Sequence, residues 1–125
     1  MNKKSTRYFS KIQENSVAKL IGGKTQPNSG ATPYAKGDIK SDSWLIECKT
    51  SMTPKQSFSI KKEWLRLIRE EAIQQGKMNY ALAFNYGPNQ ENYFILNEKK
   101  FKELINESNF EWFSNIKRWN RVRIS

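Results

Sequence analysis

Apolar residues recur at two different spacings along this chain, and the change of spacing separates expected helices from expected strands. Helical spacing runs from about Ser5 to Ile21 and again from about Ser59 to Gln75. Gly22 and Gly76 follow these two segments, and glycine is favoured just past the end of a helix. The pattern therefore predicts two amphipathic helices, each ended by a glycine.

The apolar positions also predict which side of each helix faces inward. On the first helix the stripe comprises Phe9, Ile12 and Leu20, with Tyr8 and Val17 at its margins. At about 100° per residue, Glu14 projects roughly 120° from the centre of this stripe, so we expect it on the flank, within reach of a sheet edge. The second helix has a stripe of Ile60, Trp64, Leu67, Ile68 and Ala72. Ser57 or Ser59 is its expected N-cap.

A hairpin of two short strands is expected between these helices, with a polar turn at residues 40–43. Asp38 begins the first strand, while Glu47 and Lys49 lie two apart on the second and leave it on the same face. Leu45 shares that charged face. The opposite face offers an apolar side for a core: Trp44, Ile46 and Cys48. A carboxylate and an amine on one face of a core strand indicate a functional role for these two side chains.

The rest of the chain predicts two more strands and a third helix. Met78–Phe84 is a nearly continuous apolar run, typical of a central strand buried on both faces. Asn92–Leu96 is the next strand. Asn97 is expected to cap a short helix through about Asn106, with inward residues Phe101, Leu104 and Ile105.

Composition limits the chemistry and the partners. The chain has 125 residues, which suits one domain, and its 22 Lys and Arg against 12 Asp and Glu give a net charge of +10. Such a charge favours a polyanion as partner, with nucleic acid ahead of a membrane. There is no histidine, which excludes histidine triads, histidine general bases and the usual zinc sites.

Cellular location is an expectation from the same composition. One cysteine without a partner points to a reducing compartment. A stretch of about 18 apolar residues is absent, as is a signal-peptide core after the basic N-terminus, so no membrane span is expected. We therefore expect a cytoplasmic protein of a bacterial or phage-infected cell.

Asp38 and Glu47 would converge at one end of the hairpin. Mg²⁺ takes oxygen ligands and is usually held by one or two carboxylates together with substrate phosphate. Lys49 beside them could position or activate a water molecule, or stabilise a charged phosphate oxygen. The alternative is an exposed ion pair on a strand, which is common for so short a pattern.

Glu14, Gly37-Asp38 and Ile46-Glu47-Cys48-Lys49, in this order of elements, resemble the PD-(D/E)xK nuclease superfamily, with its restriction-endonuclease-like fold. The resemblance covers roughly residues 8–105 and is strongest to the small Holliday junction resolvases of archaea and phages. It implies an α/β fold in which helices flank a central mixed β-sheet, with an αβββαβ core. The proline that leads the family signature is absent, since Lys36-Gly37 precede Asp38.

The resemblance also implies a role for each site residue. Asp38, Glu47 and the backbone carbonyl of Cys48 would bind Mg²⁺, for which Mn²⁺ would substitute. Glu14 would complete the metal site, and Lys49 would act on the attacking water or on the phosphate. Products in this superfamily carry a 5′-phosphate and a 3′-hydroxyl. These roles describe a magnesium-dependent endodeoxyribonuclease, a hydrolase active in DNA recombination or repair.

DNA contacts are expected along the Gly-, Pro- and Ser-rich loop at residues 22–37 and at the start of the second helix. The expected DNA-binding residues are Lys24, Thr25, Ser29, Thr32, Lys36, Lys55, Lys61 and Lys62. No Walker loop closes here, so no nucleotide cofactor is expected. A basic aromatic tail, about residues 107–125, belongs to the same single domain. Its aromatic residues favour core or dimer contacts over base stacking.

Size argues against base-specific restriction, because a single domain of 125 residues has no spare module for reading bases. Recognition of branched DNA, most of all a four-way junction, fits better, and a junction with two opposed cuts would require a homodimer. The alternatives are a nicking, flap or single-strand endonuclease of the same superfamily, and a basic DNA-binding module without catalysis.

Overall fold

Residues 6–26 and 38–108 are described by a computed structural model of the chain. The chain divides into two compact units, Met1–Ile95 and Leu96–Ser125. The first contains a five-stranded mixed sheet and two helices, and the second contains a helix at residues 98–108. The predicted mixed α/β class is therefore confirmed.

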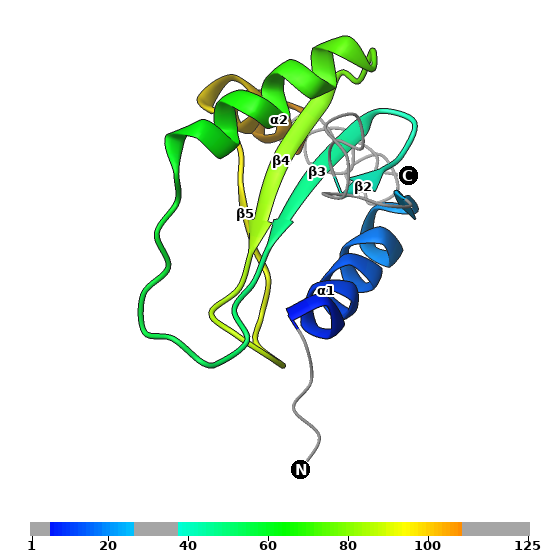
Figure 1. Ribbon diagram of the computed structural model, residues 1–125. Helices are drawn as coiled ribbons and strands as arrows, with labels where there is room; N and C mark the ends of the chain where they lie inside the picture. Colours follow the sequence, from blue (N-terminus) through cyan, green and yellow to red (C-terminus); the bar gives the residue numbers. More distant parts are fainter. Residues whose placement is uncertain (1–5, 27–37, 109–125) are drawn as a thin grey trace, which may run out of the picture. The chain divides into compact units, whose positions relative to one another are not determined.

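The elements of the first unit follow in the order α1 (Thr6–Ile21), β1 (Lys24–Thr25), β2 (Ile39–Lys40), β3 (Trp44–Lys49), α2 (Lys62–Gln74), β4 (Asn79–Phe84) and β5 (Tyr93–Ile95). The strands lie in the same order across the sheet, and only β3 and β4 are parallel (Figure 1). Parallel neighbours require a long crossover, which α2 and its flanking segments provide.

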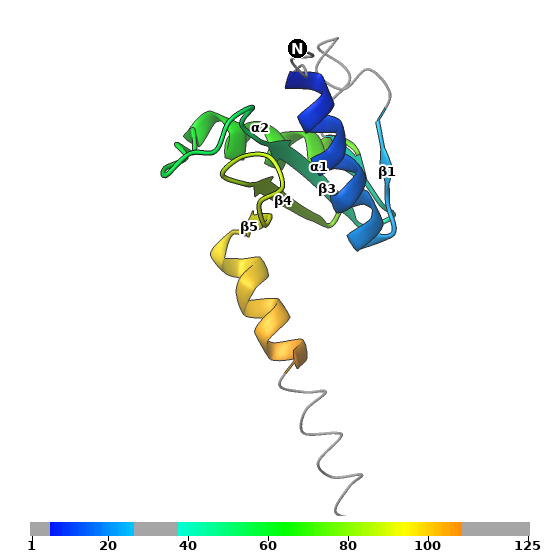
Figure 2. The same cartoon turned by 90° about the horizontal axis from the view of Figure 1, so that it is seen from below.

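The two helices cover opposite faces of the sheet (Figures 1 and 2). Leu45 on β3 packs with Ile68 and Ala72 of α2, whereas Ile46, its neighbour on the strand, points to the other face, where α1 contacts β3. Both Leu45 and Ile46 are fully buried. Leu45 is thus a main core residue on the face that also carries the charges, and the apolar side of β3 is not confined to Trp44, Ile46 and Cys48 as expected.

The predicted inward face of α1 was wrong by about a quarter turn. Ile12 and Leu20 are exposed, while the buried positions of α1 are Gln13, Val17 and Ala18. At about 100° per residue, these buried positions are centred close to Val17, some 60° from Glu14. Glu14 therefore lies nearer to the inward side of α1 than its sequence pattern indicated.

Glycine ends both helices as predicted. Gly76 has φ +69°, and the Lys77 and Gly76 amides donate to the carbonyls of Ala72 (2.8 Å) and Ile73 (3.2 Å), which is a Schellman ending. Gly22 has φ +65° and ends α1 in the same way. The start of α2 differs from the expectation, because Lys61 occupies the N-cap position without a side-chain hydrogen bond and neither Ser57 nor Ser59 caps the helix.

The hairpin, the central strand β4 and the Asn97 cap are confirmed. The Ser41 amide donates to the Trp44 carbonyl across the expected turn, and the Lys100 amide donates to Asn97 Oδ1 at 2.8 Å. The expected loop after Gly22 instead begins with a strand, since Lys24–Thr25 pair with β2.

The apolar side chains of helix 98–108 are more exposed than the sequence predicted. The three residues expected to face inward are exposed: Phe101, Leu104 and Ile105. The tail beyond residue 108 lies outside the described residues. None of the helices in the described part of the chain combines the length and the apolar character needed to cross a membrane.

Candidate functional site

The hairpin brings Asp38 and Glu47 together. The Asp38 amide donates to the Ile46 carbonyl at 3.0 Å, which holds Asp38 beside the strand that carries Glu47. Asp38 is only 8% exposed, and its Oδ2 accepts a hydrogen bond of 2.7 Å from the Cys48 amide. A side-chain hydrogen bond also joins the Asp38 and Glu47 carboxyl groups.

The pKa of the Glu47 carboxyl lies far above its usual value. Burial, the negative charge of Asp38 and a hydrogen bond with the Asp38 carboxylate raise the pKa of Glu47 to about 8, against the opposing effect of Lys49. Two carboxylates in one site repel each other, and a shared proton relieves that repulsion. A divalent cation at the same place would relieve it as well.

Glu14 approaches the pair from α1. Burial, followed by the charge of Asp38, raises the pKa of Glu14 to about 7, while Arg7 and Lys11 act in the opposite direction. The charge effect requires Glu14 and Asp38 to be near neighbours. Three carboxyl groups, from α1, from the residue before β2 and from β3, therefore contribute negative charge to one region.

The amine of this region belongs to Lys49. Its Nζ lies 3.6 Å from Glu47 Oε1 and 4.4 Å from the centre of the Trp64 ring, and the Lys49 and Glu47 side chains stay 30% and 24% exposed. Trp64 in turn contacts Phe58, whose ring stacks on Phe84 at 5.4 Å. The ammonium is thus held between a carboxylate and an aromatic face, yet remains open to solvent.

Two buried polar residues near the site were missed in the sequence. Glu71 on α2 is buried, and its charge adds to the rise in the pKa of Glu47. The sequence feature that could have revealed the burial of Glu71 is its position within the apolar stripe, one residue before Ala72 and three after Ile68. Gln13 is 3% exposed and precedes Glu14 on α1.

Gln13 ties α1 to the ends of the two central strands. Its Nε2 donates to the Lys49 carbonyl at 2.9 Å and has the Ala83 carbonyl and Asn92 Oδ1 at 3.4 and 3.3 Å. All three partners are acceptors, so the amide can take only this orientation. The position of Glu14 relative to Lys49 is fixed through this side chain.

The other predicted site residues are spread more widely. The Cys48 thiol is buried, which raises its pKa, and Asp38 adds to that rise. Of the predicted DNA-binding residues, Lys24 and Thr25 lie on β1. Three more are exposed at or before the start of α2: Lys55, Lys61 and Lys62. Ser29, Thr32 and Lys36 lie outside the described residues.

The donor set suits a hard cation. No group of three or more His, Cys, Asp or Glu side chains within residues 6–26 and 38–108 is arranged as a ready-made metal site. Asp38 and Glu47, however, form a hydrogen-bonded carboxyl pair, and Mg²⁺ commonly uses only one or two protein carboxylates, with water and phosphate as its other ligands. The residues therefore fit a magnesium ion bound together with a phosphate.

No protein-family model, curated protein or solved structure matches this chain.

Proposed function

We propose that this chain is a magnesium-dependent DNA endonuclease of the PD-(D/E)xK type that cuts branched DNA. The observation that carries the proposal is the contact between the Asp38 and Glu47 carboxyl groups, with Lys49 Nζ at 3.6 Å from Glu47 Oε1. The order of elements, αβββαββ, with a parallel β3–β4 pair beside the hairpin, supports the same assignment.

Asp38, Glu47 and Glu14 would hold Mg²⁺, which, when bound, would neutralise negative charge on the scissile phosphate and lower the pKa of a water molecule. Lys49 is exposed enough to reach substrate and donates hydrogen bonds to the attacking water or to a phosphate oxygen. The reaction adds water across the P–O3′ bond, leaving a 5′-phosphate and a 3′-hydroxyl.

Branched DNA is the substrate class that the size and charge favour. The net charge of +10 supports binding through phosphates, which carries no sequence information by itself. A junction offers shape instead of sequence, and a homodimer would present two active sites to its opposed strands. A monomer in light scattering at working concentration would count against junction resolution.

A panel of labelled substrates tests the proposal: a four-way junction, a flap, a duplex and a single strand, each with Mg²⁺, with Mn²⁺ and with EDTA. We expect metal-dependent cleavage with preference for the junction. Cleavage of the flap or the single strand alone would assign a different nuclease activity.

The competing function is a DNA-binding module without catalysis. The large positive charge favours it. DNA binding without cleavage in any divalent metal would establish that function and exclude the nuclease.

A further inference from the structure

Two lysines stand directly opposite each other at the edge of the sheet. Lys24 on β1 pairs with Lys40 on β2, and both side chains are exposed. Like charges at paired positions of antiparallel strands are destabilising. Within the described residues neither ammonium has a carboxylate partner. An arrangement that opposes folding and is not neutralised within this part of the chain indicates an anionic ligand.

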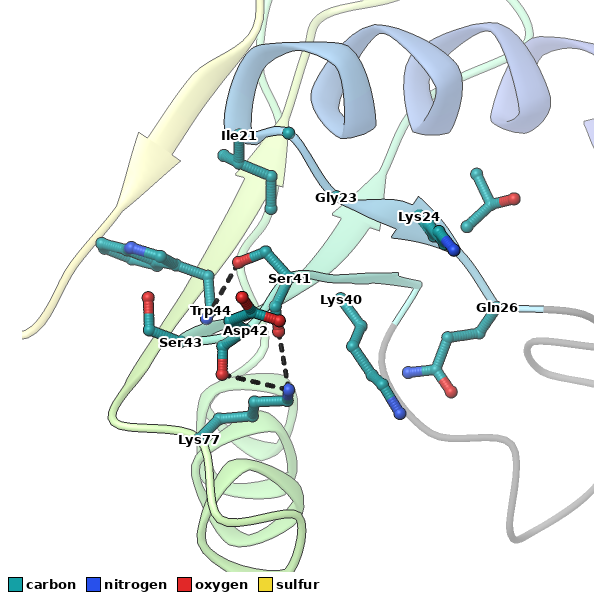
Figure 3. Close-up of a pocket in the computed structure, with 12 residues that line it drawn as sticks. Ile21, Gly23, Lys24, Gln26, Lys40, Ser41, Asp42, Ser43, Trp44 and Lys77 are labelled. Carbon is teal, nitrogen blue, oxygen red and sulfur yellow. Dashed lines mark hydrogen bonds between the residues drawn. The ribbon is translucent and has the colours of Figure 1, made fainter.

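The pair opens onto a pocket of about 740 Å³ at the turn of the hairpin (Figure 3). Three lysines and one aspartate are among its described lining residues: Lys24, Lys40, Lys77 and Asp42. The backbone of the turn forms one wall, and the chain from Gly22 to Gln26 forms another. The pocket is therefore open to solvent and of net positive charge.

Lys77 differs from the other two cations in the pocket. Its Nζ donates to the carbonyls of Ser41 at 2.6 Å and Asp42 at 3.2 Å, which holds the hairpin turn against the start of β4 (Figure 3). These bonds to neutral acceptors leave its positive charge uncompensated. Lys77 thus stabilises the turn, while Lys24 and Lys40 make no such bond within residues 6–26 and 38–108 and are available to a ligand.

The lysine pair lies on the same face of the sheet as the candidate site. Lys40 pairs with Leu45, and Leu45 and Glu47 leave the same face of β3 two residues apart, so Lys40 lies diagonally about 8 Å from Glu47. Neighbouring phosphates of one DNA strand are about 6–7 Å apart, because the strand winds around the helix axis while it rises about 3.4 Å per nucleotide. The pair is therefore placed roughly one phosphate away from one bound between Glu47 and Lys49.

We propose that Lys24 and Lys40 form a subsite for a backbone phosphate of the nucleic-acid strand, about one nucleotide from the phosphodiester at Asp38 and Glu47. The position of that phosphate relative to cleavage rests on the proposed nuclease function. Binding of the strand by the lysine pair does not, because it can be measured without any cleavage.

The test is the salt dependence of DNA binding in EDTA, measured by fluorescence anisotropy on a labelled junction and a labelled duplex. The variant is K24Q/K40Q, and the matched control is K99Q/K102Q, which removes two exposed lysines of helix 98–108. Each phosphate contact contributes about 0.9 to the slope of log K against log salt. Because the pair contacts one phosphate, we expect the slope to fall by roughly 0.9 in K24Q/K40Q and by less than half of that in the control.

Three further measurements keep the result specific. K24R/K40R preserves both charges and should restore the slope. Removing like charges relieves repulsion, so the melting temperature of K24Q/K40Q should not fall. A methylphosphonate one position from the cut site should weaken binding by the wild type several-fold and leave K24Q/K40Q unaffected.

An equal loss of slope in the control pair would show a general charge effect and overturn the subsite. So would loss of binding to anionic lipid vesicles in K24Q/K40Q with an unchanged slope on DNA, which would assign the pair to a membrane surface. If the slope falls as expected but no substrate is cut by the wild type, the phosphate subsite stands and the nuclease fails.

Discussion

The Lys49 ammonium lies 4.4 Å from the centre of the Trp64 ring, although the two residues are on different elements, at the end of β3 and in the first turn of α2. A cation over an indole face is attracted by the ring, by about 0.5–2 kcal/mol depending on its exposure. Trp64 therefore restricts where the Lys49 amine can go, and Glu47 at 3.6 Å restricts it from the other side.

Replacing Trp64 should reduce cleavage without removing a reacting group. We expect W64L to lower kcat about 3- to 30-fold, the rate equivalent of the lost attraction, and W64F to retain most of it. The shift of the Lys49 side-chain resonances, monitored by NMR, reports the same loss without cleavage. Equal activity in W64L and the wild type would show that Trp64 only packs.

Asp38→Asn and Lys49→Ala should each abolish cleavage while leaving DNA binding largely unchanged. Each removes a group from the candidate site but alters the net charge by one unit at most. Asp42→Asn is the matched control, since Asp42 is the other aspartate of the chain and lies exposed in the hairpin turn. Cleavage by Asp38→Asn at the wild-type rate would place the metal site elsewhere.

Stability without metal should fall as the pH rises through the range between about 4.5 and 8. The pKa of Glu47 is raised from 4.5 to about 8, so the folded state binds more protons than the unfolded state in that window and loses this advantage at higher pH. We expect the melting temperature to drop on the order of 5 °C between pH 5.5 and 8.5.

Two changes should cancel that drop. Glu47→Gln removes the titrating group, and its melting temperature should vary less with pH. Mg²⁺ binds the ionised carboxylates and should stabilise the wild type more at pH 8.5 than at pH 5.5. A wild-type melting temperature that rises from pH 5.5 to 8.5 in EDTA would contradict the assignment.

Gln13→Leu should destabilise the fold by about 1–3 kcal/mol, because it leaves the Lys49 and Ala83 carbonyls without the Gln13 donor. Gln74→Leu, the same change at an exposed position of α2, is the control and should have little effect. Chemical denaturation of both variants measures the difference. Similar losses in the two would mean that Gln13 does not hold α1 to the strands.

Leu45→Ala should cost about 2–5 kcal/mol, since Leu45 is fully buried between β3 and α2. Leu20→Ala makes the same change where the side chain is 68% exposed, and should cost less than about 1 kcal/mol. Denaturant titrations of the pair compare a core leucine with a surface one. If Leu20→Ala were the more damaging, the orientation of α1 would have to be revised.

Local features of the fold were readable in the sequence wherever a short-range rule acts. Gly22 and Gly76 end helices because they adopt positive φ at no steric penalty, and Asn97 caps a helix through its own side chain. The hairpin follows from a polar turn between two strands. These choices depend on residues a few positions apart, so the sequence determines them.

The same reasoning grouped Asp38, Glu47 and Lys49, because strand alternation places residues 47 and 49 on one face. It failed on the inward face of α1, since apolar Ile12 and Leu20 outweighed a polar residue in the pattern. Gln13 is buried there only because three acceptors from β3, β4 and the segment before β5 meet at its amide. Hydrophobic spacing carries no information about such distant partners.

The sequence by itself determined the class of the fold, the glycine-marked C-terminal ends of α1 and α2 and the carboxylate–lysine pattern on one hairpin. Only the tertiary structure decided which side of α1 faces the sheet, that Trp64 lies against Lys49, and that Lys24 is paired with Lys40. The physical reason is range: caps, turns and alternation are set within a few residues, whereas burial and charge depend on groups that meet only when the sheet has formed.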